Sequence, residues 1–468
     1  MLKNMSVRGH GVGLKGIVAI LFVALVLSIN FGGVLAQEST PEPSVADPVW
    51  RAFRAVRDVL EEEFSTDLTY VQSYAYEQNI WLDSIDSCDS EIFENDYREY
   101  YTGWTFRIVA LNGAQYQSRV SFDLDAVTIC DEFSDSGSEL TVDAAPDPSL
   151  PAPVAGSGAA GSFELGGHIL GLGGDTVTAM RSAGMTWVKS QLRYSVGNGT
   201  GLAQDYISQA DAQGFKILLG VVGEPSQMGD FDSYVTQFAS FLGQVAALGP
   251  DAIEVWNEPN IGREWPTGTI SGARYTQLLA AAYNAIKSVN PNIIVISGAP
   301  APTGAEGIDP ANIMNDDRFM AEMAAAGAGA YMDCVGLHYN EGVVSPSVSS
   351  GDPRDDYPTR YFNGMLGRAS VFPNKPICWT ELGFLTPEGF GQPLPAAFAW
   401  AQNVTVAQHA AYLAEAASRS AQSGRVRLMI VWNVNFTQYA GDPMGGFAIR
   451  RPDGTCPACS TLGAVMGG

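Results

Sequence analysis

From residue 162 to the end of the chain, short apolar runs alternate with longer amphipathic stretches. The longer stretches, such as 275–289 and 405–420, have apolar residues at helical spacing. Eight apolar runs have the length of buried strands: 163–168, 186–192, 216–222, 252–256, 293–297, 334–337, 377–380 and 428–432. Alternating strands and helices form a parallel sheet, and eight such units over about 300 residues predict a (β/α)8 TIM barrel over 162–468.

A doubly wound open sheet is the alternative architecture for such an alternation. It is typical of dinucleotide-binding proteins when a GxGxxG turn follows the first strand and an acidic residue lies further on. The stretches 166–167 and 171–174 are glycine-rich, but they contain no fitting GxGxxG motif. The pattern therefore favours the barrel.

The residues before the barrel divide into a domain and a linker. Helical periodicity over 50–64 is followed by strand-like runs at 70–76, 104–110 and 116–122, with an Asn112-Gly113 hairpin signal between the last two. Residues 47–133 are therefore expected to form a small α+β domain, to which the sequence assigns no role. Residues 134–161 are rich in Ser, Asp, Pro, Ala and Gly, which predicts a flexible linker.

The first 36 residues have the pattern of an export signal. A positively charged start is followed by an apolar region over 17–31 and by Val34-Leu35-Ala36, which fits the cleavage rule. The alternative is an uncleaved membrane anchor, for which the apolar region is short. We expect a signal peptide over 1–36 and a secreted, extracellular protein, with cell-surface association left open.

Charge and cysteine content narrow the function further. The formal net charge of −24 argues against nucleic acid and anionic membranes as partners.

Cysteines form disulfides in an oxidising compartment. The cysteines of this chain are Cys88, Cys130, Cys334, Cys378, Cys456 and Cys459. We expect a bond between the two in the small domain and a local bond in the C-terminal CxxC. The sequence leaves open whether the two on expected neighbouring strands are bonded. Four scattered histidines disfavour a metal site, and no cofactor is expected.

Polar and aromatic residues gather where the expected strands end, which is where the active site of such a barrel lies. Glu258 ends the fourth strand, directly after Asn257, and Glu381 ends the seventh. The other candidates for binding a substrate are Lys189, Arg193, His338, Tyr339, Trp432 and, in the loop after the fourth strand, Trp265. A buried glutamate at a strand end can instead be a structural ion-pair partner, and we assign that role to Glu254.

Two of these strand ends carry a family resemblance. Trp256-Asn257-Glu258-Pro259-Asn260 and Trp379-Thr380-Glu381 match the fourth- and seventh-strand motifs of clan A, the retaining (β/α)8 glycoside hydrolases. Residues 162–460 resemble that clan, and its cellulase-like family 5 and β-xylosidase-like family 39 in particular. The resemblance implies that Glu258 is the acid/base and Glu381 the nucleophile, and that no cofactor or metal takes part.

The resemblance also implies roles for the surrounding residues. Asn257 would bind the hydroxyl next to the anomeric carbon, Tyr339 would hydrogen-bond the nucleophile, and Trp432 would form the floor under the sugar. Lys189 stands where family 5 has an arginine, and Arg193 is the alternative cation.

The expectation is thus a secreted retaining O-glycoside hydrolase that cleaves a β-linked polysaccharide or glycoconjugate by double displacement. Its partner would be a polysaccharide or oligosaccharide substrate, with no nucleic acid and no obligatory protein partner evident. The alternative is a non-catalytic carbohydrate-binding protein of the cell surface on a glycosidase scaffold, which the presence of both glutamates disfavours. The sugar, its linkage and endo or exo action stay open.

Overall fold

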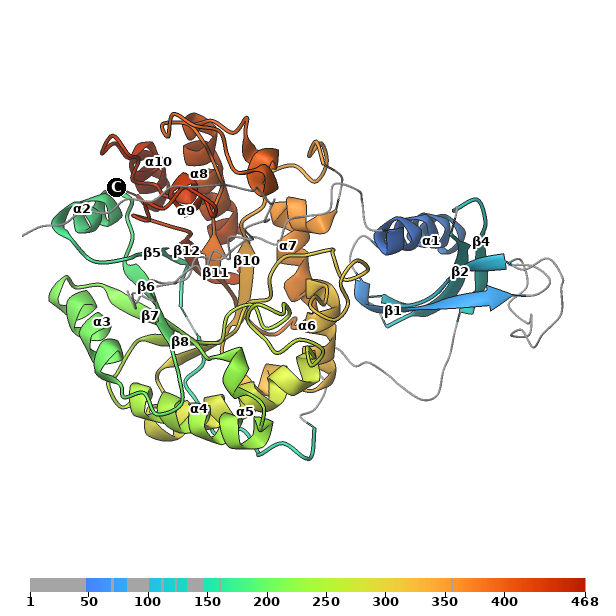
Figure 1. The fold of residues 1–468 in the computed structure, drawn as a ribbon, viewed down its shortest axis with the longest axis horizontal. Helices are drawn as coiled ribbons and strands as arrows, with labels where there is room; N and C mark the ends of the chain where they lie inside the picture. Colours follow the sequence, from blue (N-terminus) through green and yellow to red (C-terminus); the bar gives the residue numbers. More distant parts are fainter. Residues whose placement is uncertain are drawn as a thin grey trace, which may run out of the picture. The chain divides into compact units, whose positions relative to one another are not determined.

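The computed structural model describes residues 48–68, 71–81, 101–110, 113–122, 124–132, 147–159, 161–354 and 357–467 (Figure 1). The expected export signal and Cys88 lie outside these ranges. Within them, no helix combines the length and apolar character that crossing a membrane requires.

The C-terminal part of the chain is an eight-stranded parallel barrel surrounded by helices, which confirms the predicted fold class (Figure 1). Its strands are β5 (Glu164–His168), β6 (Trp187–Arg193), β7 (Lys216–Val222), β8 (Ala252–Val255), β9 (Ile294–Ser297), β10 (Val335–Tyr339), β11 (Ile377–Leu382) and β12 (Val426–Val431). They pair in the order β10-β11-β12-β5-β6-β7-β8-β9. A parallel bridge between Ile296 and Cys334 joins the two ends of this series and closes the ring.

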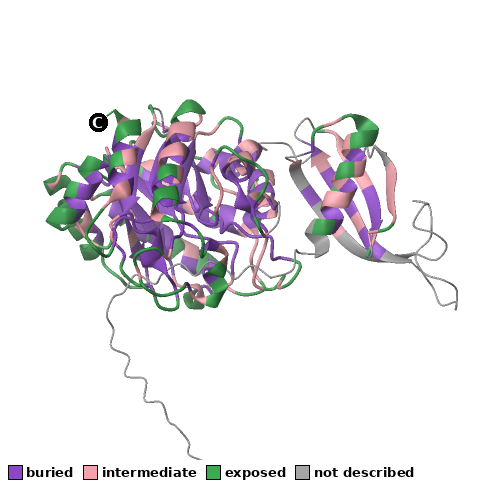
Figure 2. Cartoon of the chain, turned by 90° about the horizontal axis from the view of Figure 1, so that it is seen from above, coloured by how far each residue is buried: buried purple, intermediate pink, exposed green. Residues whose placement is uncertain are grey.

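The helices that follow the strands begin at residues suited to capping. Asp230, Ser271 and Thr405 accept hydrogen bonds from backbone N–H groups in the first turns of the helices that begin at Phe231, Gly272 and Val406. These bonds satisfy donors that a helix leaves unpaired. The helices of the barrel are α2 (Gly174–Ser182), α3 (Gly201–Ala212), α4 (Phe231–Ala246), α5 (Gly272–Val289), α6 (Asp316–Ala325), α7 (Phe362–Arg368), α8 (Val406–Gln422), α9 (Met444–Phe447) and α10 (Pro457–Met466). Their buried faces cover the strands, and exposed residues lie on the outer faces (Figure 2).

The inside of the barrel is layered, because alternate residues of a strand point to the same face. Near the strand starts it is apolar, with Trp187, Leu218 and Ala252 in one buried cluster with both cysteines of the Cys334–Cys378 disulfide. That bond, which the sequence left open, links the start of β10 to β11 with a Cα–Cα distance of 5.9 Å. Lys189 and Glu254 lie two positions further along β6 and β8 than Trp187 and Ala252.

The residues before the first barrel strand have two parts. The small domain is a four-stranded antiparallel sheet in the order β1-β2-β3-β4, with α1 packed on it. Its elements are α1 (Pro48–Phe64), β1 (Val71–Trp81), β2 (Tyr101–Ala110), β3 (Gln115–Ser121) and β4 (Val127–Glu132), the last of which the sequence pattern did not predict. Cys130 on β4 is disulfide-bonded. Because Cys88 is outside the described residues, its pairing with Cys130 stays a prediction.

Part of the expected linker follows a fixed course along the barrel. Composition predicts flexibility over 134–161, but the described stretch 147–159 is hydrogen-bonded to the barrel instead. Pro151 O accepts from the Tyr331 hydroxyl at 2.7 Å, and Val154 N donates to Asn284 Oδ1 at 2.7 Å. Ala159 is buried in the apolar cluster at the strand starts. This stretch therefore covers the end of the barrel opposite the strand tips.

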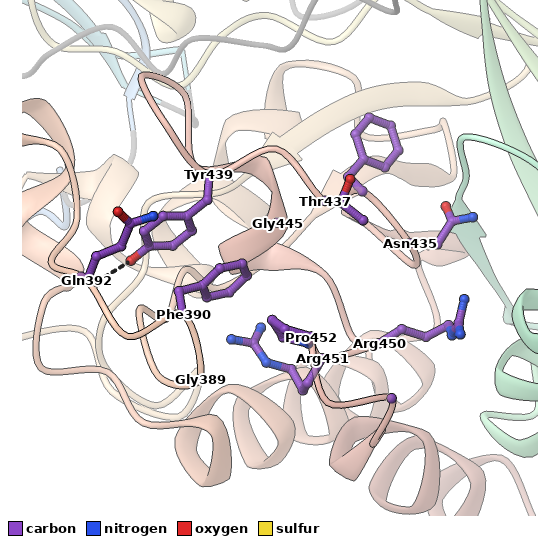
Figure 3. A pocket seen from close by; sticks show the side chains of 12 residues that line it. Gly389, Phe390, Gln392, Asn435, Thr437, Tyr439, Gly445, Arg450, Arg451 and Pro452 are labelled. Carbon is purple, nitrogen blue, oxygen red and sulfur yellow. Dashed lines mark hydrogen bonds between the residues drawn. The ribbon is translucent and has the colours of Figure 1, made fainter.

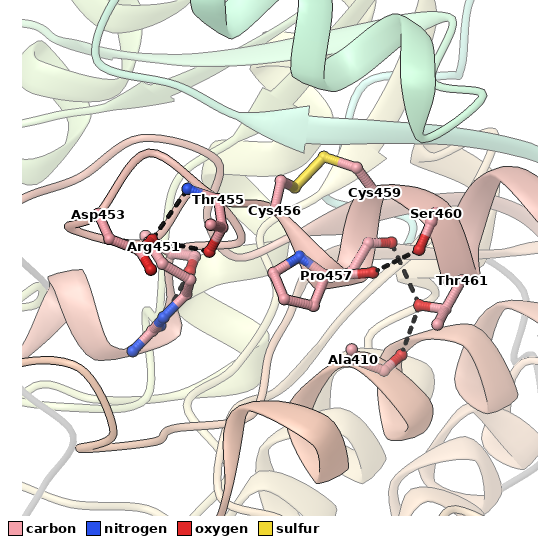
Figure 4. The surroundings of a disulfide bond; sticks show 11 residues. Ala410, Arg451, Asp453, Thr455, Cys456, Pro457, Cys459, Ser460 and Thr461 are labelled. Atoms are coloured by element: carbon pink, nitrogen blue, oxygen red, sulfur yellow. Dashed lines mark hydrogen bonds between the residues drawn. A yellow bond between two sulfur atoms is a disulfide. The ribbon is translucent and has the colours of Figure 1, made fainter.

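The C-terminal CxxC is a local disulfide, as predicted. Cys456 and Cys459 are bonded at the start of α10, and Thr461 one turn later donates to the Ala410 carbonyl of α8 (Figure 4). The bond thus fixes the first turn of a helix that packs on α8 and α2.

Candidate active site

The strand tips bring together a buried cluster of charged side chains. Lys189, Glu254, Glu258, His338 and Glu381 come from four different strands or the loops after them, and none is more than 1% exposed. Charges are buried at such density only when they pair with one another. The positions of these five residues follow from strand register, from a bulge and from one loop.

Strand register positions the first group. Lys189 and Glu254 lie two residues after Trp187 and Ala252, so they share the inner face with them. Gly220 lies between their strands on β7, and a Cβ there would be 3.2 Å from Lys189 Cε and 3.3 Å from Glu254 Oε2. The missing side chain leaves room for the ion pair.

A β-bulge turns Glu381 toward the same space. Cys378 faces the barrel interior, and regular alternation from it would make Glu381 face outward. However, β11 carries one extra residue against both neighbours between Trp379 and Leu382, where His338 pairs with Glu381. Bulges often re-aim a side chain beside a functional site. This one brings Glu381 to the inner face of the barrel.

The loop after β8 holds Glu258 in an unusual backbone conformation. Trp256 has φ 79° and Glu258 has φ 45°, the left-handed region that residues with a Cβ seldom adopt. Trp256 N donates to Val221 O and Glu258 N to Ala299 O, both at 2.9 Å. Conformations of this kind persist where the surroundings determine them, and they cluster at functional sites.

Glu381 is surrounded by cationic and polar groups. Lys189 Nζ donates to Oε1 at 3.3 Å, Asn340 Nδ2 donates to Oε2 at 3.4 Å, and His338 Nδ1 lies 3.9 Å from Oε2. Burial alone would raise the pKa of Glu381, but the charges of His338 and Lys189 together lower it below its usual range. Glu381 is therefore held as a carboxylate.

Lys189 is itself fixed by a second carboxylate. Its Nζ lies 2.8 Å from Glu254 Oε2 and donates to Thr380 O at 3.2 Å. Burial acts to lower the pKa of Lys189, but Glu254 and Glu381 outweigh it and raise the pKa. Glu254 thus has the structural role expected from the sequence, and Lys189, rather than Arg193, is the cation that contacts Glu381.

His338 links the two glutamates at the strand ends. Its Nδ1 donates to Glu258 Oε1 at 3.1 Å, and the same atom is 3.9 Å from Glu381 Oε2. Burial would lower the pKa of His338, but the neighbouring Glu381 and Glu258 raise it. Glu258 Oε1 and Glu381 Oε2 lie 3.1 and 3.9 Å from the same nitrogen, so these two oxygens are at most about 7 Å apart. This limit includes the ~5–5.5 Å separation of retaining glycosidases and the lower end, ~6.5 Å, of the inverting range.

A second histidine, His168, lies near the other carboxylate oxygen of Glu381, and its pKa is shifted in the opposite direction to that of His338. His168 Nδ1 at the end of β5 is 3.8 Å from Glu381 Oε1, and burial lowers the pKa of His168. Its ring packs edge-on against Trp432 and Phe436, at centroid distances of 4.8 and 5.4 Å. Trp432, at the end of β12, thus packs beside His168, and its peptide bond to Asn433 is cis. Its role as the floor under a sugar stays a prediction.

Asn257 has the clearest unused hydrogen-bonding group. The side chain is buried, and among the described residues its Oδ1 has no hydrogen-bond partner. A buried acceptor without a partner costs free energy, so it usually serves a ligand or an ordered water. Asn257 directly precedes Glu258 in the loop after β8, which makes this acceptor a candidate for a ligand of the site.

The rim of the site carries an ion-pair chain that the sequence analysis missed. Arg263 Nη2 lies 2.9 Å from Glu258 Oε2, and its Nε lies 3.5 Å from Glu264 Oε1. Arg193 contacts the other oxygen of Glu264 at 3.3 Å and the Gly223 carbonyl at 3.0 Å. Arg193 is therefore a partner of Glu264 at the rim and not of Glu381. The spacing of five residues from Glu258 was the only available signal for Arg263.

Tyr339 does not take the predicted position. Its hydroxyl donates to the Arg360 carbonyl at 3.1 Å, and its ring packs against Phe362, Trp379 and Phe384. The expected hydrogen bond to Glu381 is therefore wrong. His338 faces into the barrel, so its neighbour on the strand faces the helices. Asn340, the next residue, supplies the hydrogen bond instead.

Trp265 is a core residue and not the predicted subsite wall. It is fully buried, its Nε1 donates to Thr269 O at 3.0 Å, and its ring packs edge-on against Trp256, Phe231 and Tyr275. It supports the loop after β8 from behind, between α4 and α5. No part of it lines the cluster.

The carboxylates and histidines of the described part of the chain do not form a metal site. There, no three or more His, Cys, Asp or Glu side chains are arranged to hold a metal ion. The cluster instead pairs its carboxylates with Lys189, His338 and Arg263.

No protein-family model and no curated protein sequence matches the chain. Similar solved structures include a GH128 (subgroup II) endo-β-1,3-glucanase from Sorangium cellulosum, with 16% identity, coverage of 65% of this chain and 97% of the other, and a TM-score of 0.42. A GH5-4 broad specificity endoglucanase from Clostridium longisporum (13%, 64% and 86%, TM-score 0.42) and an endo-1,4-β-mannanase from Rhizomucor miehei (15%, 69% and 99%, TM-score 0.42) are similar as well. Likenesses at this level establish neither a family nor a function.

Proposed function

We propose that this protein is a retaining O-glycoside hydrolase that acts on a β-linked polysaccharide or glycoconjugate. The observation that carries the proposal is the buried pair of Glu258 and Glu381, bridged by one histidine nitrogen, with Lys189 and His338 keeping Glu381 ionised. Two nearby carboxyl groups in different electrostatic environments are what double displacement requires.

In the first step, the Glu381 carboxylate attacks the anomeric carbon and forms a glycosyl-enzyme ester. Glu258, as the acid, transfers a proton to the glycosidic oxygen, and the bond between the anomeric carbon and that oxygen breaks. Lys189 and Asn340 each contact one oxygen of Glu381 and orient the nucleophile. The unpartnered Oδ1 of Asn257 accepts a hydrogen bond from a sugar hydroxyl, and Trp432 provides an apolar surface for the ring.

In the second step, Glu258 takes a proton from water, and the resulting hydroxide attacks the anomeric carbon. The ester bond breaks, Glu381 returns to the carboxylate, and the sugar leaves with its original anomeric configuration. Arg263 and His338 each contact one oxygen of Glu258 and hold it in place through both steps.

Substitutions of the two glutamates test this assignment with a dinitrophenyl β-glycoside, whose leaving group needs no proton. In Glu258→Ala, azide should restore turnover and give the β-configured azide, since a small anion needs no general base. In Glu381→Ala, azide should give the α-configured product from the vacated face. Glu341→Ala is the control, because Glu341 is also buried and ion-paired, with Arg360 in the loop after β10. It should show no anomer-specific rescue.

Two results would overturn the proposal. The first is release of the inverted anomer by the wild-type protein, followed by NMR. The second is identical behaviour of the two glutamate variants toward the activated substrate. If the wild-type protein binds β-1,3- and β-1,4-glucans, β-1,4-mannan or β-1,4-xylan but cleaves none of them, it is a non-catalytic carbohydrate-binding protein instead.

We also propose that the protein is exported with cleavage after residue 36. Mass analysis of the N-terminus of the secreted product tests this.

A further inference from the structure

A cavity of about 550 Å³ lies beside the candidate active site, between the chain after β11 and the chain after β12 (Figure 3). Its lining includes Phe390, Gln392, Phe436, Thr437, Tyr439 and Arg450. The volume falls within the ~300–1,000 Å³ of small-molecule sites. The mechanism proposed above makes no use of this cavity.

One residue connects the cavity to the site. Phe436 lines the cavity, and its ring is 5.1 Å from that of Trp432 and 5.4 Å from that of His168. His168 lies 3.8 Å from Glu381 Oε1, and the Trp432 ring packs against His168. A chain that crosses the site over Trp432 would therefore reach the cavity after passing Phe436.

The strand order indicates which end of a substrate the cavity would receive. β12 and β8 are four strands apart in either direction around the ring, so they lie on opposite walls of the barrel. Glu258 follows β8, and a proton donor lies on the side of the departing group. The cavity next to β12 is then on the side of the sugar that remains on the enzyme.

The walls of the cavity suit a sugar. The rings of Phe390 and Tyr439 are stacked at 4.0 Å, and the Tyr439 hydroxyl donates to the Gln392 carbonyl at 3.2 Å, which fixes one wall (Figure 3). Across from it, the Arg450 guanidinium has an ion pair with Asp175 at 3.2 Å, and Asp175 is 88% exposed. An ion pair with so exposed a partner is weak, so Arg450 can donate to a ligand. The Arg451 guanidinium lies over the Phe390 ring at 5.1 Å, so this wall is rigid. A rigid apolar wall with a few polar groups suits the C–H groups and hydroxyls of a sugar.

We propose that this cavity is an outer subsite that binds a sugar unit on the retained side of the cleavage point. The inference rests on the proposed function and adds to it that the protein acts on oligomeric chains rather than on single glycosides. It follows that substrates long enough to reach past Phe436 are cleaved more efficiently than shorter ones.

Thr437→Trp tests the subsite by filling the cavity without removing any wall. Thr437 is exposed and lines the cavity, and Thr178→Trp is the matched control, because Thr178 is an exposed threonine on α2 outside it. The assay compares kcat/KM for dinitrophenyl β-glycosides that carry one sugar and three sugars. We expect the three-sugar to one-sugar ratio to fall about tenfold in Thr437→Trp relative to Thr178→Trp, the scale of one well-placed contact. An equal ratio in the two variants would overturn the subsite.

A second measurement covers the case in which no glycoside is cleaved, which would refute the proposed function. Calorimetric titration with gluco-, manno- and xylo-oligosaccharides of three and four units then measures the binding affinity without requiring cleavage. Weaker binding to Thr437→Trp than to Thr178→Trp would retain the cavity as a sugar site. Equal binding to both, or no binding to the wild type, would overturn it.

Discussion

Replacing Lys189 by methionine should separate the electrostatic role of this lysine from its structural role. Methionine has a similar unbranched shape but no charge. The lysine lies 3.3 Å from Glu381 Oε1 and 2.8 Å from Glu254 Oε2. The substitution therefore removes a cation from the expected nucleophile and leaves Glu254 as a buried charge without its closest partner.

The effect on catalysis follows from the lowered pKa of Glu381. A carboxylate with a lowered pKa stays ionised to lower pH, and an opposite charge within about 4–6 Å accounts for about 1–3 pH units of such lowering. Without the lysine, the acidic limb of kcat/KM should move upward by about 1–3 pH units. The limb of kcat/KM is the right readout, because it reports the free enzyme.

The effect on stability follows from Glu254. Breaking a buried ion pair by removing one partner costs about 3–5 kcal/mol, which for a domain of this size lowers Tm by on the order of 10 °C. In Lys189→Met/Glu254→Gln the lone charge is gone, so stability should recover while the acidic limb stays above that of the wild type. Denaturant unfolding and pH–rate profiles of the three proteins measure both effects. An acidic limb of Lys189→Met that coincides with the wild-type limb would refute the reasoning.

Three further predictions concern other parts of the barrel. Burial and the nearby Arg451 lower the pKa of His409 to about 3, so between about pH 6.5 and 3 the unfolded chain binds a proton that the folded chain does not. The free energy of unfolding should therefore fall by on the order of 4 kcal/mol as the pH drops through this range. His409→Gln should flatten this fall when urea unfolding is measured as a function of pH. Removing both cysteines of the Cys334–Cys378 bond, which spans 44 residues, should cost about 4 kcal/mol in non-reducing urea unfolding. Trp265→Ala should lower the unfolding free energy by about 3–5 kcal/mol and change KM little, whereas Trp432→Ala should mainly lower kcat/KM. Equal kinetic losses in both tryptophan variants would contradict their different positions.

The sequence predicted the parts of the fold that depend on periodicity. Eight apolar runs matched eight strands, and 216–222 coincides with β7 (Lys216–Val222). Other strand ends differ by one or two residues, because a strand such as β10 (Val335–Tyr339) continues through polar residues once they face a buried cluster. The four-residue spacing of Glu254 and Glu258 was also informative, since it distinguished a deep ion-pair partner from a residue at the mouth.

The side chains that point into the site could be predicted only where residues of a strand alternate regularly between its two faces. The prediction that Tyr339 lies in the site disregards the alternation along its strand. Val335 and Leu337 share its alternate positions and face the helices, so the alternation indicates that Tyr339 does so too. Glu381 was placed correctly, but its inward direction depends on a bulge that no apolar pattern reveals. Arg263 lies in a loop, where side-chain direction follows tertiary contacts rather than any period. Trp265 in the same loop was misread because an aromatic residue in a loop can face the core as well as the solvent.

The stretch 147–159 has a consequence for where this protein can be divided. It supplies Ala159 to the apolar floor of the barrel and binds Asn284 and Tyr331 on the outside. A shortened chain that starts at the first strand would lack this cover and expose Trp187 and its apolar neighbours to water. The autonomous barrel unit therefore begins no later than Leu150, which packs against the main core well before the first strand. A protease cut or a domain fusion placed at 160 would damage the barrel.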